Sequence, residues 1–369
     1  MKCLSNTKKK WPMKNSTTAM TSTTAIDYKI VSLSSVNDNQ RYTFYKKVFP
    51  GRASFITKHW KWLYGVERSG ITPIVAIIGD QIIGHAGLMP VDLLSPQGDL
   101  FQAIWFTDFA VLPEYQKHGI GKNLTLKWME LCSSQVTLTC NDLSLRIFKK
   151  VGWDETCSAI RCALPIHPLR WSSLAKYFFW PKSLSPISLW LHLFIRDAAP
   201  VNVHLLKDDA GKFISLIADL EKSPKKNSEA NVRISRNENW LEWRLLKYPF
   251  LEDLYFFEYN GCFSIVEKFY SHGICRAHIL YLGGCERVSE LKLYKSIILW
   301  SLKNNIDLVW LHTNDPDLPK ELKSILPAQK AMRFASWSKD TCRREELMGG
   351  LIGLQAIDGD HSLTHDRDI

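Results

Sequence analysis

A short stretch of the chain combines glycines, cations and a helix start in the order that anion binding needs. The apolar segment Trp105–Val111 has the pattern of a buried strand, Pro113 stops it, and residues 116–122 continue as Gln-Lys-His-Gly-Ile-Gly-Lys. Gly119 and Gly121 let the backbone approach a ligand closely because they carry no Cβ. A helix beginning there would direct unpaired N–H groups and the positive end of its dipole at the same point. Residues 116–122, which we call the cradle, therefore predict a site for phosphate.

The elements around the cradle are predicted from hydrophobic spacing and turn residues. Residues 73–78 and 81–84 flank Gly79-Asp80 and predict a β-hairpin. A stripe of apolar residues at helical spacing predicts a helix from Gly119, namely Ile120, Leu124, Trp128 and Leu131. Further strands are predicted at residues 103–111, 136–140 and 156–164. Between the last two strands, a helix capped by Asn141 or Asp142 would end at Gly152.

The cradle resembles the acetyl-CoA motif of the GNAT superfamily of acetyltransferases. The match is Gln116-x-x-Gly119-x-Gly121 after a strand that ends in Val111-x-Pro113. A second family signature resembles Asn141-x-x-Ser144-x-x-Ile147-Phe148-x-x-x-Gly152-Trp153. Upstream, Ile83-Gly84-His85-Ala86-Gly87 is similar to the strand that enters the acceptor site. The resemblance spans roughly residues 27–165 and implies an acyltransferase that uses acetyl-CoA as its co-substrate.

The resemblance also implies where acetyl-CoA binds. Backbone groups of Phe109 and Val111 would pair with the pantetheine arm as an added strand does. The pyrophosphate would lie on the cradle, which comprises Gln116, Lys117, His118, Gly119, Ile120, Gly121 and Lys122. Asn141 and Ser144 would contact the cofactor near its thioester. The cysteines and histidines of the chain show no metal-ligand spacing, so no metal is predicted.

In this superfamily a deprotonated amine attacks the thioester directly, so the site needs a group that removes the amine proton. We predict Asp108 or His85 for this role, since they lie on neighbouring strands near the acceptor site. Asp108 would otherwise be a hydrogen-bond acceptor at a strand edge, and His85 a buried histidine with satisfied partners. Phe148 stands where relatives carry a proton-donating Tyr, so either Tyr115 protonates the thiolate or the thiolate leaves unassisted.

The second half of the chain repeats this pattern without the cradle. Its aromatic residues Trp240, Trp243 and Tyr248 repeat those at positions 60, 62 and 64, and strands are predicted at 254–259, 262–268, 276–282, 306–312 and 332–337. Gly283-Gly284 lacks the motif spacing, and Glu286 would repel phosphate. The predicted fold class is α+β, with two tandem GNAT-like domains, each a mixed, mostly antiparallel sheet flanked by helices. The second domain would be a degenerate copy that shapes the acceptor site or packs as a scaffold.

Composition places these domains in a globular protein. Of the 369 residues, 46% are hydrophobic, 23% are charged and 14 are Trp. No apolar run reaches the ~18–20 residues of a membrane-spanning helix. We predict a disordered basic tail at residues 1–26, the acetyl-CoA-binding domain at 27–165, an aromatic and Pro-rich connector at 166–200, the degenerate domain at 201–345 and a tail at 346–369.

Charge and cysteine content bear on partners and location. The net charge is +10, and lysines of the N-terminal tail supply much of it, which favours a solvated surface over a nucleic-acid partner. Aromatic and basic residues mix in the connector as in a peripheral membrane patch, but its prolines break any long amphipathic helix. The nine cysteines are odd in number and form no CxxC pair, which predicts reduced thiols in the cytoplasm. The sequence indicates no oligomeric state.

The predicted reaction is transfer of an acetyl group from acetyl-CoA to a primary amine of a small molecule. Acetylation of a protein amine is one alternative. Because Phe148 removes the usual acid, a catalytically weak acyl-CoA-binding or interaction module is another.

Overall fold

A computed structural model describes residues 26–138, 141–166, 194–222, 231–284, 286–314, 328–351 and 354–358. We call residues 26–166 the first half and residues 194–358 the second half. Residues 1–25 of the predicted N-terminal tail and the aromatic residues of the connector up to position 193 lie outside the described residues. No helix in the described ranges has the length and apolar character that crossing a bilayer requires.

The first half begins with one strand and three helices, and from residue 74 onward its strands and helices follow the order that the hydrophobic pattern predicts. Asn37 and Gln40 form a reciprocal capping box at the start of its first long helix, which satisfies backbone groups that a helix end leaves unpaired. The elements are β1 (Lys29–Ser32), α1 (Asp38–Val48), α2 (Ala53–Leu63), α3 (Val66–Ser69), β2 (Ile74–Ile78), β3 (Gln81–Leu94), β4 (Leu100–Val111), α4 (Ile120–Met129), β5 (Ser134–Leu138), α5 (Asp142–Lys150) and β6 (Asp154–Pro165).

The second half has a similar order of elements, with an added short strand at residues 233–234 and, within the described residues, no helix between its last two strands. Its hairpin turns at Asn260-Gly261, whose φ values of 46° and 70° suit a type I′ turn. The elements are β7 (Asn202–Leu205), α8 (Ala210–Lys222), β8 (Arg233–Ile234), α9 (Glu238–Leu241), β9 (Leu254–Tyr259), β10 (Cys262–Ser271), β11 (Ile274–Gly284), α10 (Arg287–Lys303), β12 (Leu308–Thr313), β13 (Ala328–Ser338) and α12 (Thr341–Met348).

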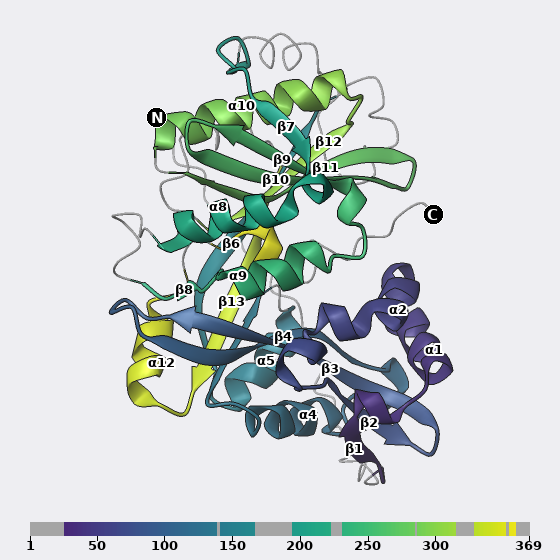
Figure 1. The fold of residues 1–369 in the computed structure, drawn as a ribbon. Helices are drawn as coiled ribbons and strands as arrows, with labels where there is room; N and C mark the ends of the chain where they lie inside the picture. Colours follow the sequence, from purple (N-terminus) through teal and green to yellow (C-terminus); the bar gives the residue numbers. More distant parts are fainter. Residues whose placement is uncertain are drawn as a thin grey trace, which may run out of the picture.

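One 13-stranded mixed sheet runs through both halves, with β6 and β13 side by side between them (Figure 1). Its main path is β1-β2-β3-β4-β5-β13-β6-β12-β11-β10-β9-β7, and β8 pairs with β3. Counted inward from each end of the sheet, three antiparallel strand pairs are followed by one parallel pair. The parallel pair is β4–β5 in the first half and β11–β12 in the second. The last strands are exchanged, because β13 pairs with β5 and β6 pairs with β12. This symmetry supports the predicted duplication, which stays a prediction.

Two details differ from the sequence-based expectation. The halves share one sheet rather than forming a separate sheet each, because of the exchanged strands. The prediction of a tail after residue 345 is wrong for the residues described there. Leu347, Leu351 and Leu354 are buried in the main hydrophobic cluster, and residues 356–358 form a 3-10 turn against it. The apolar side chains of this segment gain burial that a solvated tail would lack.

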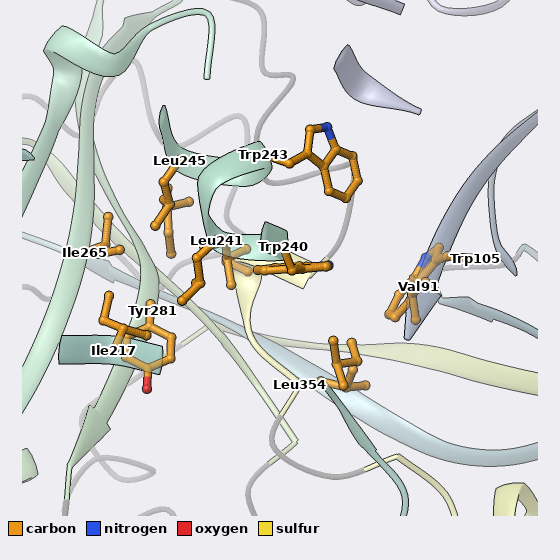
Figure 2. Close-up of a cluster of buried hydrophobic side chains, with 14 of the residues drawn as sticks. Val91, Trp105, Ile217, Trp240, Leu241, Trp243, Leu245, Ile265, Tyr281 and Leu354 are labelled. Carbon is orange, nitrogen blue, oxygen red and sulfur yellow. The ribbon is translucent and has the colours of Figure 1, made fainter. Parts of the chain in front are cut away.

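The main hydrophobic cluster joins the two halves. Figure 2 shows Val91 and Trp105 of the first half in the same cluster as Trp240 and Leu241 of the second. Beside this cluster, the indole N–H of Trp62 donates to the carbonyl of Trp243 at 2.9 Å, and the indole of Trp243 donates to the carbonyl of Trp62 at 2.8 Å. The paired aromatic residues noticed in the sequence thus contact each other across the junction.

Candidate active site

Part of the edge of β4, a strand in the first half, is not paired with the neighbouring strand β5. β4 and β5 run parallel, and their pairing ends where Phe106 meets Thr137. β4 continues to Val111, and no strand of the described residues pairs with that part of it on the β5 side. An extended ligand can therefore add to this edge by backbone hydrogen bonds.

A β-bulge lies in β4 directly beside the open edge. His85 of β3 pairs with Ala110 and Gly87 pairs with Thr107, so Asp108 and Phe109 together face the single residue between them. Asp108 has a φ of 48°, which few residues other than glycine, Asn and Asp adopt. The bulge turns the backbone of β4 locally and fixes where the Asp108 side chain points.

The carboxylate of Asp108 is held by donors from both ends of α2. Arg52, which precedes α2, donates to its two oxygens at 2.7 and 3.3 Å. Tyr64, which comes directly after α2, donates to one of them at 2.9 Å. The Asp108 side chain is fully buried (0% exposed), while that of Arg52 is 15% exposed. Burial and the nearby carboxylate raise the pKa of Tyr64, which keeps its hydroxyl protonated as a donor.

His85 is also fully engaged in hydrogen bonds. Its Nδ1 lies 2.8 Å from the backbone oxygen of Asp108, which can only accept, so Nδ1 carries the proton. Its Nε2 lies 3.1 Å from the hydroxyl of Tyr45 and therefore accepts from it. Burial lowers the pKa of His85, which favours this neutral form. His85 thus ties the bulge to α1, where Tyr45 lies.

The cradle has the backbone geometry of an anion site. Gly119 caps α4 with a φ of 77°, and Lys117 has a φ of 72°. Within the described residues the N–H groups of residues 117–122 have no backbone acceptor. A Cβ on Gly121 would lie 3.2 Å from Phe109 and 3.2 Å from Ile147, so a side chain there would enter the space between β4 and α5. The first turn of α4 contains no acid that would oppose an anion.

Side chains of the cradle fit a phosphate as well. Lys117 and Lys122 are exposed. The Nδ1 atom of His118 is buried and has no hydrogen-bond partner among the described residues. Gln116 donates from its side-chain amide to the carbonyl of Val111 at 3.1 Å, which anchors the cradle to the end of β4. The residues present therefore fit the pyrophosphate of a CoA ester.

The sequence model of the acetyltransferase (GNAT) family matches residues 38–153, which include the bulge and the cradle. Residues 38–153 are a GNAT acetyltransferase domain. A search of curated proteins found no match to the chain.

Solved structures resemble the chain beyond the GNAT domain. A GCN5-related N-acetyltransferase from Kribbella flavida is 14% identical with a TM-score of 0.53, over 84% of this chain and 71% of that one. One from Anabaena variabilis is 14% identical with a TM-score of 0.54, over 86% and 74%. The N-myristoyltransferase of Saccharomyces cerevisiae, with bound myristoyl-CoA, is 11% identical with a TM-score of 0.57, over 87% and 85%. At these identities the likeness shows the fold alone.

The remaining predicted residues of the GNAT domain take up capping, core and peripheral positions. Asn141, one of the two caps that the sequence predicts, caps α5 by accepting from the backbone N–H of Ser144 at 2.8 Å. Phe148 is buried and packs against Phe106 and Trp153, so it belongs to the core. Tyr115 is half-buried on a different apolar cluster, and its hydroxyl makes no hydrogen bond to Asp108 or His85.

The sequence analysis missed three residues of this site. Arg52, Tyr64 and Tyr45 hold the bulge. Arg52 and Tyr45 stand in no recognisable motif, and the repeated aromatic pattern that includes Tyr64 did not point to this role. One signal could have found the first of them. A buried acid on a central strand requires a cation or several donors, and Arg52 is among the cations that precede the first predicted strand. No group of three His, Cys, Asp or Glu residues suited to a metal ion occurs in the described ranges.

Proposed function

We propose that the chain transfers the acetyl group of acetyl-CoA to the primary amine of a small molecule by direct transfer. The observation that carries this proposal is the open edge of β4, which leads straight into the cradle at the start of α4. This arrangement offers a linear ligand backbone hydrogen bonds along one end and an anion site at the other. Acetyl-CoA has that shape and charge, and when bound it supplies the activated acyl group.

The cofactor roles are proposed for residues already in position. The backbone of Phe109 and Val111 would bind the pantetheine arm, although the Val111 carbonyl already accepts from Gln116. The free amides of the cradle, with Lys117, His118 and Lys122, would bind the pyrophosphate. The capping bond of Asn141 uses only its carbonyl oxygen, which leaves its amide N–H₂ for the region of the thioester.

We propose positioning roles for Asp108 and His85 in place of proton abstraction. The Asp108 carboxylate is buried and bonded to Arg52 and Tyr64, and both ring nitrogens of His85 are engaged. An acceptor amine would then arrive in its neutral form or lose its proton to water. The thiolate would leave unassisted or take a proton from Tyr115. The rate should accordingly depend on the pKa of the amine rather than on that of a protein group.

The test is calorimetric titration of acetyl-CoA into the wild-type chain and into Gly121→Trp. We expect micromolar affinity for the wild type and a loss of at least about 100-fold for the variant, because the indole would fill the space that the cradle leaves beside Phe109. Gly211→Trp is the matched control, since Gly211 is also the second residue of a helix, and its added Cβ would meet no atom within 4 Å. Equal affinity in all three proteins would place the cofactor elsewhere.

Asp108 and His85 are both occupied by hydrogen bonds within the protein, which favours one other function. This function is an acyl-CoA-binding module without turnover. Release of free CoA thiol in the presence of amine pools separates the two functions. Release with one class of amine supports the enzyme and names its substrate class. Binding with no release from any amine would replace the enzyme by the binding module. The scattered thiols of the chain support a reducing compartment such as the cytoplasm for either function.

A further inference from the structure

The second half contains a strand gap that matches the open edge of β4. β11 and β12 run parallel, and their pairing ends where Ile279 meets Leu311, although both strands continue. A register shift also lies between β10 and β11, since Ile265 pairs with Tyr281 and Val266 with Ile279. Counted from this shift, Leu282 takes the position that Val111 holds in the first half. Both halves of the sheet therefore contain a parallel strand pair with a gap at its end and a register shift beside the gap.

In the second half a segment of the chain itself fills the gap. The segment is Leu354–Asp358, which we call the C-terminal segment. Gln355 forms an antiparallel bridge with Thr313 of β12, and its side-chain oxygen accepts from the backbone N–H of Leu282 at 2.6 Å. The N–H of Leu354 donates to the side chain of Asn314 at 2.7 Å. One residue thus contacts both strands that border the gap.

Buried charges fix the end of the C-terminal segment. Arg236 donates to both carboxylate oxygens of Asp358 at 2.8 and 2.6 Å, and the two side chains are 5% and 1% exposed. Arg236 also contacts Glu221 at 3.2 Å. A buried Arg–carboxylate pair with two bonds holds its partners in one geometry. The segment is therefore a packed part of the second half.

The C-terminal segment is also connected to the helix that holds Asp108. Arg244 donates to the carbonyl of Ile357 at 3.1 Å and lies over the ring of Trp62, 5.4 Å from its centre. Trp62 belongs to α2, whose two ends carry the donors to Asp108. A continuous path of contacts leads from the filled gap to the bulge of β4.

We propose that the C-terminal segment is a built-in occupant of the second strand gap, where it stands in place of an acyl-CoA arm. It closes that half to a second cofactor, and through Arg244 and Trp62 it holds α2 over Asp108. The proposal rests on the fold and its contacts. Only its statement of one cofactor per chain depends on the proposed function.

Amide hydrogen exchange on the full chain tests the proposal without any need for activity. Gln355→Ala removes the acceptor for Leu282, so we expect exchange of the β11 and β12 ends (residues 280–284 and 311–314) to rise at least about 10-fold. Deletion of residues 354–369 should raise exchange there further and also in α2 at residues 53–63. Gln97→Ala, at an exposed loop position of the first half, is the control and should change neither region.

Three results would contradict the proposal. Unchanged exchange at residues 280–284 in Gln355→Ala would mean that the segment does not hold the gap. Unchanged exchange in α2 after the deletion would remove the connection to Asp108. Calorimetry of the wild type should give one acetyl-CoA per chain, and two would contradict closure of the second gap. Absence of any acetyl-CoA binding would count against the proposed function and leave the exchange results to decide this inference.

Discussion

The two strand gaps of the sheet differ in the residues that lead from each strand into the next helix. After β4 the chain passes through glycines with free amides into α4, whose first turn has no acid. After β11 it passes Glu286 into α10, whose first turn contains Glu290. The first gap is thus bordered by a positive helix end, and the second lies beside carboxylates and is filled by Gln355. A shared framework therefore does not give a shared site, because local charge and glycines decide which gap receives an anionic ligand.

The exchanged strands are a feature that the two halves share, since neither half can complete its part of the sheet alone. We predict that a fragment of residues 26–166 does not fold, because β5 would lose β13, its partner from Ser134 to Leu138. Side chains such as Val91 and Trp105 would also lose the second-half part of their cluster. Circular dichroism and size-exclusion chromatography should show an unfolded or aggregated fragment.

Co-expression with residues 194–369 is the control and should restore a soluble complex. A fragment that melts cooperatively without its partner would show that β6 can pair with β5 directly, and that the exchange is dispensable. In that case the halves would be independent domains, as the sequence pattern predicts.

Each half contains a buried Arg–Asp pair among its described residues, and these two pairs should differ in their contribution to stability. Arg236→Gln leaves Asp358 and Glu221 without their cation in a nearly closed site and should lower the free energy of unfolding by about 3–5 kcal/mol. Arg52→Gln should cost less, about 2–3 kcal/mol, because Arg52 is partly exposed and Asp108 keeps the bond from Tyr64. Urea unfolding of both variants measures the difference.

The control for this pair is Lys127→Gln. Lys127 is 55% exposed in its ion pair with Glu130, so its loss should change stability by less than about 0.5 kcal/mol. If Arg52→Gln proved more costly than Arg236→Gln, the bulge of β4 rather than the C-terminal segment would be the more tightly held part of the molecule.

Local pattern was sufficient for most elements. The run of aromatic residues before the Asn260-Gly261 turn predicts β9 with the bounds that the structure gives it. The cradle was found because glycines and cations lie within seven consecutive residues. The exchange of β6 and β13 could not be found in this way, since a hydrophobic strand pattern does not specify its partner.

At the candidate site too, the local sequence pattern does not predict which distant residues come into contact. Asp108 and His85 were predicted as reactive groups, but their bonding depends on Arg52, 56 residues away, and on Tyr45, 40 residues away. The tail prediction failed for a similar reason. The apolar residues of 345–358 are interrupted by three glycines, which are unfavourable inside a helix or strand. Only the strand gap of the second half shows why Leu354 and Ile357 become buried.

The smallest predicted effect concerns His85, an ionisable residue beside the bulge that has an apolar counterpart in the second half. His85 pairs next to the shift in the first half, and the apolar Ile265 takes that place in the second. Burial lowers the pKa of His85, so the folded protein keeps it neutral while the unfolded chain takes up a proton near pH ~6.5. The stability that it contributes is complete above that pH and is lost as pH falls toward the lower folded pKa, with a slope of at most about 1.4 kcal/mol per pH unit.

The difference between the wild type and His85→Gln isolates this slope. Gln can still donate to the Asp108 carbonyl but cannot be protonated, whereas other histidines such as His59 titrate equally in both proteins. Urea midpoints between pH 7.5 and 5 should therefore converge as pH falls, with the wild type losing more. Parallel curves would mean that His85 is protonated as easily in the folded chain as in the unfolded one. His85 would then be free to exchange a proton with an acceptor amine, and the base role would return to it.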